Sequence, residues 1–262
     1  NYELIEKVED IDKWLNEAEE SGEIAVDTET SSLDPHQANL VGISFSTKIG
    51  KACYIPIGHN EGKNLEEKKV IKKIKPILED KSIKKIGQNI KFDYIIFYHK
   101  GINMNSMEDT MLMSYVLDAG KNRHNMDVLS EIHLDHKTIA FKDIVGTGKK
   151  QINFSEVKID IAKDYAAEDA DITYRLYKIF LKNLKSENLI SIYELFEKPL
   201  IKILASMEIK GRGTANFSAS LMHAALLSFG KLIWKVCWSE PNPNVIVITR
   251  MKALVMIVSL IL

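Results

Sequence analysis

The sequence has little cysteine and no excess of charge of either sign. Its two cysteines, Cys53 and Cys237, exclude a disulfide scaffold and are typical of a reducing compartment. Acidic residues number 36 and basic residues 35, so the formal net charge of −1 gives the molecule no overall basic field. A polyanionic partner would therefore have to be met by local basic patches or by metal ions.

The chain also shows no secretory leader and no clear membrane-spanning run. It begins at Asn1 without an apolar segment behind it, which predicts no secretory signal and indicates a piece of a longer protein. The apolar run over 245–262 contains Arg250 and Lys252 and is marginal for a membrane span. We therefore expect no membrane partner.

Charged residues become scarce towards the C-terminus. The whole chain is 45% hydrophobic and 27% charged, as in ordinary globular proteins, yet residues 214–262 hold five charged side chains. This change predicts a folded body over 1–210 and a divergent tail over 211–262. We interpret the tail as frameshift- or insertion-derived sequence, with a short packing segment and a membrane anchor as less favoured alternatives.

The spacing of apolar residues predicts strands first and then strands alternating with helices. Strands are expected over 23–29, 40–46 and 52–57, joined by short links as an antiparallel meander, and over 84–86. Helices are expected over 65–78, 92–98, 110–117, from about 156 to 183 with a cap at Ser155, and over 187–208 with a kink or offset start at Pro199. This order predicts an α/β fold with a mixed β-sheet flanked by helices.

Two acids end the first of these strands. Asp27 and Glu29 are two residues apart, so their side chains point to the same face of the sheet. Two carboxylates side by side against an apolar sheet repel each other and are costly to bury without a partner. A divalent cation between them would remove that cost. The alternative is a solvated turn.

Three further residues suggest the same chemistry less directly. Tyr165 and Asp169 are four apart and share a helix face, although an ordinary hydrogen-bonded tyrosine would give the same spacing. Asp93 follows Gly87-Gln88-Asn89 in the first turn of a predicted helix that Asn89 could cap. The alternative for Asp93 is an acid favoured by the helix dipole. Asp109, just before another helix, is interpreted as a helix cap.

Taken together and in order, these motifs resemble a known family. The stretches VDTETSSLD, KKIGQNIKFD, HKTIAFKDIVGTGK and YAAEDADITYRL are similar to the 3'–5' exonuclease domain of bacterial family A DNA polymerases, and the resemblance spans roughly residues 4–210. The family belongs to a nuclease superfamily with four acids and a tyrosine or histidine. Asp164 stands where the histidine subclass has its histidine, so the tyrosine subclass is indicated. The resemblance implies a ribonuclease-H-like fold.

The resemblance also implies a metal site and a reaction. The metal-binding acids would be Asp27, Glu29, Asp93 and Asp169, and Tyr165 with Glu29 would orient the attacking water. Two divalent cations, Mg²⁺ or Mn²⁺ with Zn²⁺ as an alternative at one site, would assist cleavage of the terminal phosphodiester. The products would be 5'-mononucleotides released from the 3' end.

Five residues would contact the substrate by the same resemblance. Leu33 would wedge against the terminal base, Phe141 would stack on it, and Gln88 and Asn89 would contact the strand near the cleaved bond. Arg123 lies in a loop that the family places near the strand. The alternatives are core positions for Leu33 and Phe141 and a solvated charge for Arg123.

We therefore expect a metal-dependent exonuclease acting on the 3' end of single-stranded or frayed DNA. It would be the proofreading part of a DNA polymerase I that lacks its polymerase domain, monomeric, cytoplasmic and associated with the bacterial nucleoid in DNA replication and repair. A separate polymerase polypeptide is a candidate partner. The alternatives are an RNA 3'-exonuclease like ribonuclease D and a non-catalytic remnant of a truncated polymerase.

Overall fold

The computed structural model of the chain describes residues 2–118 and 120–211. Asn1–Ala205 form one compact unit, and a second unit begins at Ser206 and is described as far as Gly211. The expected tail therefore lies almost wholly outside the described residues, and both its boundary and its interpretation stay predictions.

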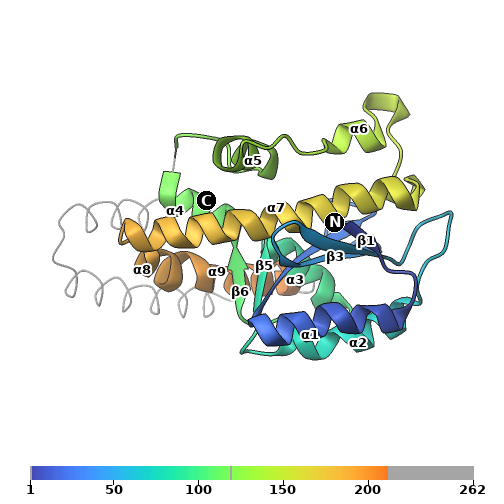
Figure 1. Ribbon diagram of the computed structural model, residues 1–262, viewed down its shortest axis with the longest axis horizontal. Coiled ribbons are helices and arrows are strands. Elements are labelled where there is room, and N and C mark those ends of the chain that lie inside the picture. The colour runs from blue at the N-terminus through green and yellow to red at the C-terminus, as the bar shows by residue number, and fades with distance from the viewer. Residues whose placement is uncertain (1, 119, 212–262) are drawn as a thin grey trace. The chain divides into compact units, whose positions relative to one another are not determined.

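A six-stranded mixed sheet forms the centre of the compact unit (Figure 1). Its strand order is β1-β4-β3-β2-β5-β6. β3 pairs antiparallel with both β2 and β4. The other three pairs are parallel: β1 with β4, β5 with β2, and β6 with β5. The expected meander and mixed sheet are thus confirmed. The strands are β1 (Tyr2–Leu4), β2 (Glu23–Thr30), β3 (Leu40–Lys48), β4 (Lys51–Pro56), β5 (Lys84–Gly87) and β6 (Met107–Asp109).

Helices cover both faces of this sheet. The long helix α7 (Ile159–Ser186) crosses one face, and α1 (Ile11–Ser21) packs on the other with α2 (Glu67–Glu79) against it (Figure 1). The remaining helices are α3 (Ile90–His99), α4 (Thr110–Asp118), α5 (Met126–Leu134), α6 (Phe141–Val145), α8 (Ile190–Ile192) and α9 (Lys198–Gly211). Every helix expected from the sequence is present, with ends shifted by a few residues.

Small side chains let α7 lie close to the sheet. Ala167 and Ala170 pack with Ala52 of β4 in one buried cluster, and Ala162 and Ala166 pack with Val41 of β3 in another. A helix with bulkier residues on this face would stand further from the strands. The close approach brings the acid at position 169 of α7 within reach of the end of β2.

Of two expected helix details, one is absent and one is present. Ser155 does not cap the long helix; Asn153 accepts from the Ser155 amide and forms a capping box with Glu156 around a separate short turn, and α7 begins only at Ile159. The expected offset at Pro199 is confirmed, because a π-helical turn over Tyr193–Glu197 precedes α9.

Five elements were not expected: β1, β6, α1, α5 and α6. For α1 the signal was present, since Ile11, Trp14, Leu15 and Ala18 repeat at helical spacing and are all buried. The other four span three to nine residues, too few for a periodic pattern to emerge.

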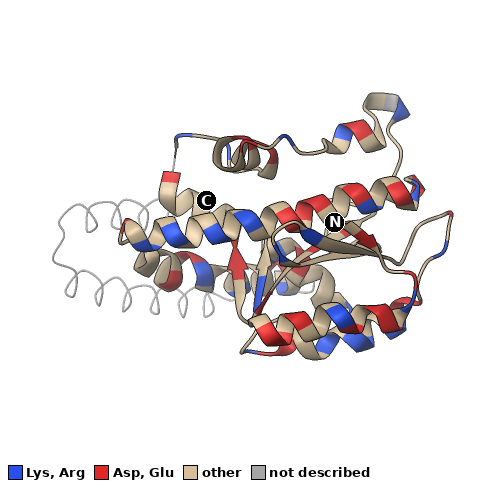
Figure 2. Cartoon of the chain, in the orientation of Figure 1, with Lys and Arg blue, Asp and Glu red and all other residues tan. Residues whose placement is uncertain are grey.

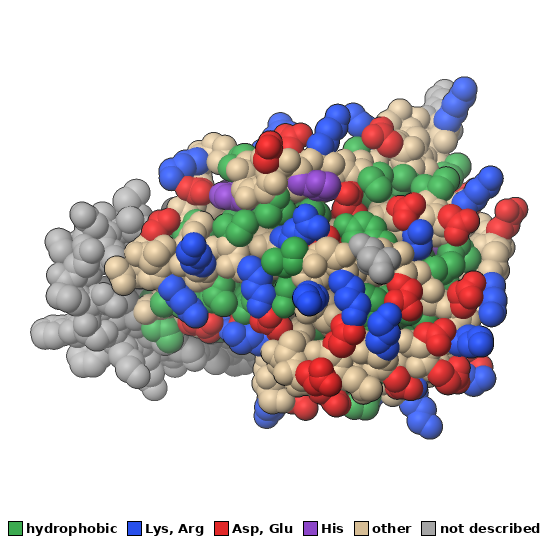
Figure 3. Space-filling model, viewed as in Figure 1, with side chains coloured by type: hydrophobic (Ala, Val, Ile, Leu, Met, Phe, Trp, Pro, Cys, Tyr) green, Lys and Arg blue, Asp and Glu red, His purple; other side chains and the backbone are tan. Residues whose placement is uncertain are grey.

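Charges of both signs are spread over the described surface, but single helices differ in their charge. α1 carries mostly acids, α2 carries five lysines between Glu67 and Glu79, and α7 carries its acids in the first half and most of its Lys and Arg in the second (Figure 2). The space-filling view of the same side shows the two signs interspersed rather than gathered into one basic patch (Figure 3). Among the described residues no helix is both long and apolar enough to cross a membrane.

Candidate metal centre and adjoining cleft

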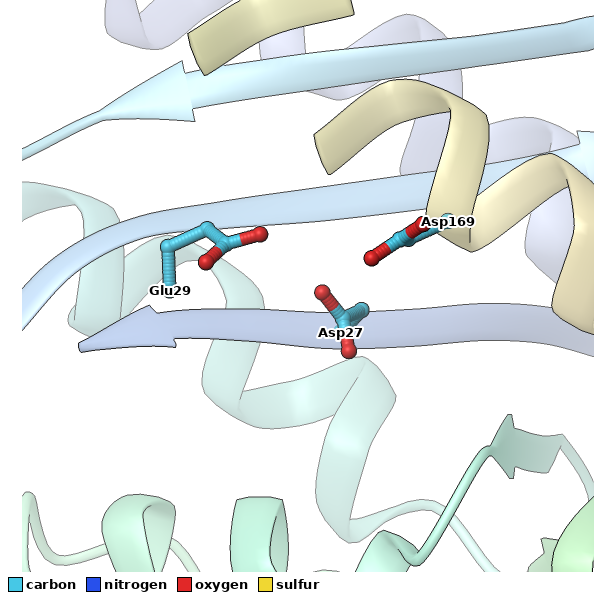
Figure 4. A group of neighbouring side chains, drawn as sticks. All are labelled: Asp27, Glu29 and Asp169. Atoms are coloured by element: carbon cyan, nitrogen blue, oxygen red, sulfur yellow. The ribbon is translucent and has the colours of Figure 1, made fainter. Parts of the chain in front are cut away.

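Three carboxylates converge at the carboxyl end of β2. Asp27 and Glu29 extend from that strand and Asp169 faces them from α7 (Figure 4). One oxygen from each lies within 4.8 Å of the other two. The alternation of a strand and the close packing of α7 together place these acids side by side, although they come from segments about 140 residues apart.

Asp93 lies beside this group and is not one of its three members. It sits in the first turn of α3, is 3% exposed, and accepts a 2.5 Å hydrogen bond from the Thr28 hydroxyl. Thr28 stands between Asp27 and Glu29 on the opposite face of β2. Thr28 therefore holds Asp93 next to the end of β2, where it lines the same cleft as the three acids of the cluster.

Burial makes the charged forms of all four carboxylates costly. It raises the pKa of Asp27 to about 6. Burial first, and then neighbouring negative charges, raise the pKa of Glu29, Asp93 and Asp169 well above their usual values. Burial also raises the pKa of Tyr165, so its hydroxyl stays protonated. Such a group is stable only if it holds protons or a cation.

The donor set fits a hard divalent cation. Converging carboxylate oxygens are the ligands that Mg²⁺ and Mn²⁺ prefer, and Zn²⁺ also accepts them. Ser44, directly opposite Asp27 on β3, adds a buried hydroxyl with no hydrogen-bond partner among the described residues. A bound cation would neutralise the excess negative charge, and a water coordinated to it could form a hydrogen bond with the Ser44 hydroxyl.

The stability of the metal-free chain should depend on pH in a direction opposite to ordinary acid unfolding. Because folding raises the pKa of these acids, the folded chain binds more protons than the unfolded chain between about pH 4 and pH 7, so stability falls as pH rises through that window. With a chelator present, we expect Tm to be several degrees higher at pH 6 than at pH 8, since ~1 kcal/mol shifts Tm by about 2–4 °C for a chain of this size.

Mg²⁺ or Mn²⁺ should reverse that trend, because the cation competes with protons for the same oxygens. Scanning calorimetry at the two pH values, with chelator and with metal, measures both effects. A metal-free Tm that rises from pH 6 to pH 8 would contradict the assignment of the shifted carboxylates.

A cleft of about 450 Å³ opens over the acids. Its wall includes all five residues assigned to catalysis from the sequence, together with Leu33, Gln88, Asn89 and Phe141. The structure thus brings together nine of the ten expected site residues. Arg123 is exposed in the loop before α5 and does not line this cleft.

Apolar side chains stand exposed at the rim of the cleft. Leu33 is 93% exposed and Phe141 42% exposed, so the alternative core positions for both are wrong. Phe141 stacks on Phe154 with ring planes 3° apart and lies 5.9 Å, centroid to centroid, from Tyr165. The rim therefore offers a flat aromatic surface and a free aliphatic side chain next to the carboxylates.

Gln88 and Asn89 differ in how much of their amide is free. The Gln88 amide donates to the His124 carbonyl at 2.8 Å and accepts from the Thr110 hydroxyl at 2.5 Å, so both of its ends are engaged. Asn89 does not cap α3 with its side chain, contrary to expectation, and has left-handed backbone with φ of 60°. Asp109 accepts from the Asn89 and Ile90 amides instead.

One wall of the cleft was not predicted. Residues 151–154 line it, with Gln151 and Ile152 exposed. Asn153 ties this segment to the strand-end loop by donating to the Ser31 carbonyl at 2.7 Å. These residues form a 3-10 turn and a loop, which carry no periodic signal in the sequence.

Known proteins share both the sequence and the fold. A family model described as a 3'–5' exonuclease matches residues 2–185. DNA polymerase I of Rhizobium leguminosarum is 41% identical over 231 residues, and that of Pseudomonas aeruginosa 39% identical over 218; each match covers 80% of this chain. This chain spans about a quarter of those proteins, 23% and 24% of their lengths.

Among solved structures, ribonuclease D of Escherichia coli superposes with a TM-score of 0.60 at 15% identity, covering 78% of this chain and 50% of that one. At that identity the likeness concerns the fold alone, and the expected ribonuclease-H-like fold is confirmed. The sequence matches over residues 2–185 carry the family assignment. The chain therefore belongs to the 3'–5' exonuclease family found in bacterial DNA polymerase I.

Proposed function

We propose that this chain removes nucleotides from the 3' end of single-stranded or frayed DNA in a metal-dependent hydrolysis. The single observation that carries the proposal is the convergence of Asp27, Glu29 and Asp169 at the floor of a cleft whose rim exposes Leu33 and Phe141. Carboxylates that bind divalent cations can bring those cations to a phosphodiester, whose negative charge they neutralise. Apolar residues at the rim can stack against a base of any identity.

Each acid has a role in this proposal. Asp27, Glu29 and Asp169 would hold the divalent cations, and Asp93, which lines the same cleft and is held by Thr28, would support them. When bound, the cations lower the pKa of water and neutralise charge on the phosphate. The Tyr165 hydroxyl, kept protonated by burial, and Glu29 orient the attacking water. No basic patch is needed at the bond that is cut.

The remaining cleft residues hold the strand. Leu33 wedges under the terminal base and Phe141 stacks on it, while Asn89 contacts the strand near the cleaved bond. Gln88, whose amide is engaged by Thr110 and His124, contacts the strand only after giving up one of those bonds or through its side-chain carbons. Arg123 meets the strand further from the cleaved bond.

Single-turnover digestion of labelled oligonucleotides tests the proposal. Excess protein with Mg²⁺ or Mn²⁺ should shorten single-stranded DNA from the 3' end and release 5'-mononucleotides, and chelator should stop it. A 3'-phosphorylated or 5'-labelled strand distinguishes the direction. Release of oligonucleotides rather than mononucleotides, or no cleavage by folded, metal-loaded protein, would contradict it; in the latter case the chain is a non-catalytic remnant.

RNA is the second candidate substrate. The fold is shared with ribonuclease D, described as an exoribonuclease involved in structured RNA processing. The sequence relatives are DNA polymerases, which favours DNA. An RNA strand of the same sequence in the same digestion decides between them, and a faster rate on RNA than on DNA would favour the ribonuclease.

Truncating either rim residue should weaken substrate binding more than turnover. Stacking of a base on an aromatic side chain contributes about 1–3 kcal/mol, so Phe141→Ala should raise KM for single-stranded DNA by ~5- to 100-fold while kcat changes less. Leu33→Ala should raise KM by a smaller factor, because leucine offers only apolar contact to the base. Steady-state kinetics on a short oligonucleotide measures both constants. Ile132→Ala, which removes an exposed apolar side chain of α5 outside the cleft, is the control. An unchanged KM in both rim variants would contradict their assignment.

The biological setting is also a proposal. We infer a monomer that acts in the bacterial cytoplasm on nucleoid DNA during replication and repair. Because this chain corresponds to about a quarter of its polymerase relatives, the synthesis step would come from a polymerase part outside these 262 residues or from a separate polypeptide.

A further inference from the structure

Tyr54 occupies the place directly opposite Glu29 on the sheet. Glu29 of β2 pairs with Gly42 of β3, and side chains of directly paired residues in antiparallel strands share one face, about 5 Å apart. A Cβ on Gly42 would lie 2.1 Å from the Tyr54 hydroxyl and 2.3 Å from its ring. The tyrosine ring from β4 therefore covers Gly42 and fills the space that a side chain there would take.

A histidine fixes the direction of the Tyr54 hydroxyl. His59 Nδ1 lies 2.9 Å from the Val157 carbonyl, which can only accept, so Nδ1 carries a hydrogen and donates. Burial lowers the pKa of His59, so the ring is neutral and its Nε2 is an acceptor. Nε2 lies 2.7 Å from the Tyr54 oxygen, and Tyr54 must donate to it.

The proton of Tyr54 thus points away from the acids. Burial, followed by the negative charges of Glu29 and Asp27, raises the pKa of Tyr54, which keeps the hydroxyl neutral and places it within the electrostatic reach of both. With its proton committed to His59, the phenol oxygen offers only lone pairs to its other neighbours. A carboxylate gains nothing by turning towards such an oxygen.

We propose that Tyr54, held by His59, is a positioning residue for Glu29. The fixed ring closes the side of the sheet opposite Glu29. It thereby directs the Glu29 carboxylate towards Asp27 and Asp169, the two acids drawn with it in Figure 4. Because Val157 lies just before α7, the same chain of bonds also ties β4 to the start of the helix that carries Asp169. The inference rests on the proposed function of the acids as cation ligands.

Tyr54→Phe in the full chain tests the proposal, because it keeps the ring and removes the bond to His59. Groups that orient metal ligands typically contribute 10–100-fold in metal affinity, so we expect Mn²⁺ affinity, measured by titration calorimetry, to fall by about 10-fold or more. In DNA digestion kcat should fall while KM for DNA stays within about twofold. Tyr174→Phe is the matched control: it removes a buried tyrosine's bond to Glu23 at the far end of β2.

Substitutions at two neighbours separate positioning from simple packing. His59→Gln keeps one donor and one acceptor and should retain Mn²⁺ affinity better than His59→Leu, which keeps neither. Gly42→Ala should lower Mn²⁺ affinity at least as much as Tyr54→Phe, because its Cβ displaces the ring. A merely structural role would lower Tm in these variants without this order in Mn²⁺ affinity and kcat.

The outcomes distinguish this proposal from the function on which it rests. If the wild type neither binds Mn²⁺ nor cleaves DNA, the proposed function fails. If the wild type does both and Tyr54→Phe matches it in Mn²⁺ affinity and kcat, only the positioning role is overturned.

Discussion

Asp27→Asn is expected to lower the rate of 3'-end cleavage by about 10³-fold or more. Asp27 is central to the acid cluster, and loss of its charge weakens the hold on every cation placed there. Metal ions contribute several kcal/mol to such transition states, and ~4 kcal/mol corresponds to about a thousandfold in rate. Single-turnover digestion of labelled single-stranded DNA with Mg²⁺ or Mn²⁺ measures the loss.

The same variant should be more stable than the wild type when metal is removed. Burial raises the pKa of Asp27 to about 6, so at pH 8 the wild-type chain is folded with an unfavourable charge that asparagine lacks. We expect a gain on the order of 1 kcal/mol in the free energy of unfolding in chelator at pH 8. Urea unfolding followed by circular dichroism measures this gain.

This combination excludes the trivial explanation of lost activity. A variant that loses activity because it unfolds would melt below the wild type, whereas Asp27→Asn should melt above it in chelator. Asp12→Asn on α1 is the control: that aspartate is ion-paired with Lys73 on the surface, and its loss should change neither rate nor stability appreciably. Activity within tenfold of wild type in Asp27→Asn would contradict the assignment of Asp27.

How much of the site could be predicted depended on how far apart its members lie in sequence. The pair Asp27 and Glu29 was visible because the strand period is two, and Tyr165 with Asp169 because the helix period is near four. Local periodicity fixes which face a side chain takes. It does not say which faces meet, so the approach of Asp169 to Asp27 came only from family resemblance and required the packing of α7.

The contact made by Asp93 also could not be predicted from local periodicity. Its place in a first helical turn was predictable, but its bond to Thr28 depends on β2 and β5 being neighbours in the sheet. The wall formed by residues 151–154 was missed altogether, since its place depends on a loop fold rather than on a repeating pattern. Asn89 was assigned the wrong task because a cap from the same segment is the common arrangement, and here the cap comes from β6.

Asp109→Ala should lower the free energy of unfolding by about 3–5 kcal/mol. The Asp109 carboxylate is 1% exposed and accepts from four backbone amides. Asn89 and Ile90 begin α3, at 3.1 and 3.0 Å, and Met111 and Leu112 begin α4, at 2.9 and 3.3 Å. A hydrogen bond to a charged group contributes about 1.5–3 kcal/mol, and buried amides left unpaired add their own penalty, though such terms are not fully additive.

Asp109→Asn should fall between alanine and the wild type, since it keeps one acceptor oxygen and places an amide group against donors. Urea unfolding of the full chain measures both variants, with Asp12→Ala as the exposed control expected to cost no more than about 0.5 kcal/mol. A loss below about 1 kcal/mol for Asp109→Ala would contradict the role of this residue as a double cap.

The two aspartate variants should therefore move stability in opposite directions, for one physical reason. Asp109 is buried and Asp27 half-buried, and loss of water around the carboxylate raises the pKa of each to about 6. Asp109 has four backbone amides that favour its charge, whereas no described residue donates a hydrogen bond to the Asp27 carboxylate, so only an added cation can offset its loss of water. A carboxylate already satisfied by amides stabilises the fold. A carboxylate without hydrogen-bond donors is available to bind a cation. Replacing it therefore lowers activity and does not lower stability.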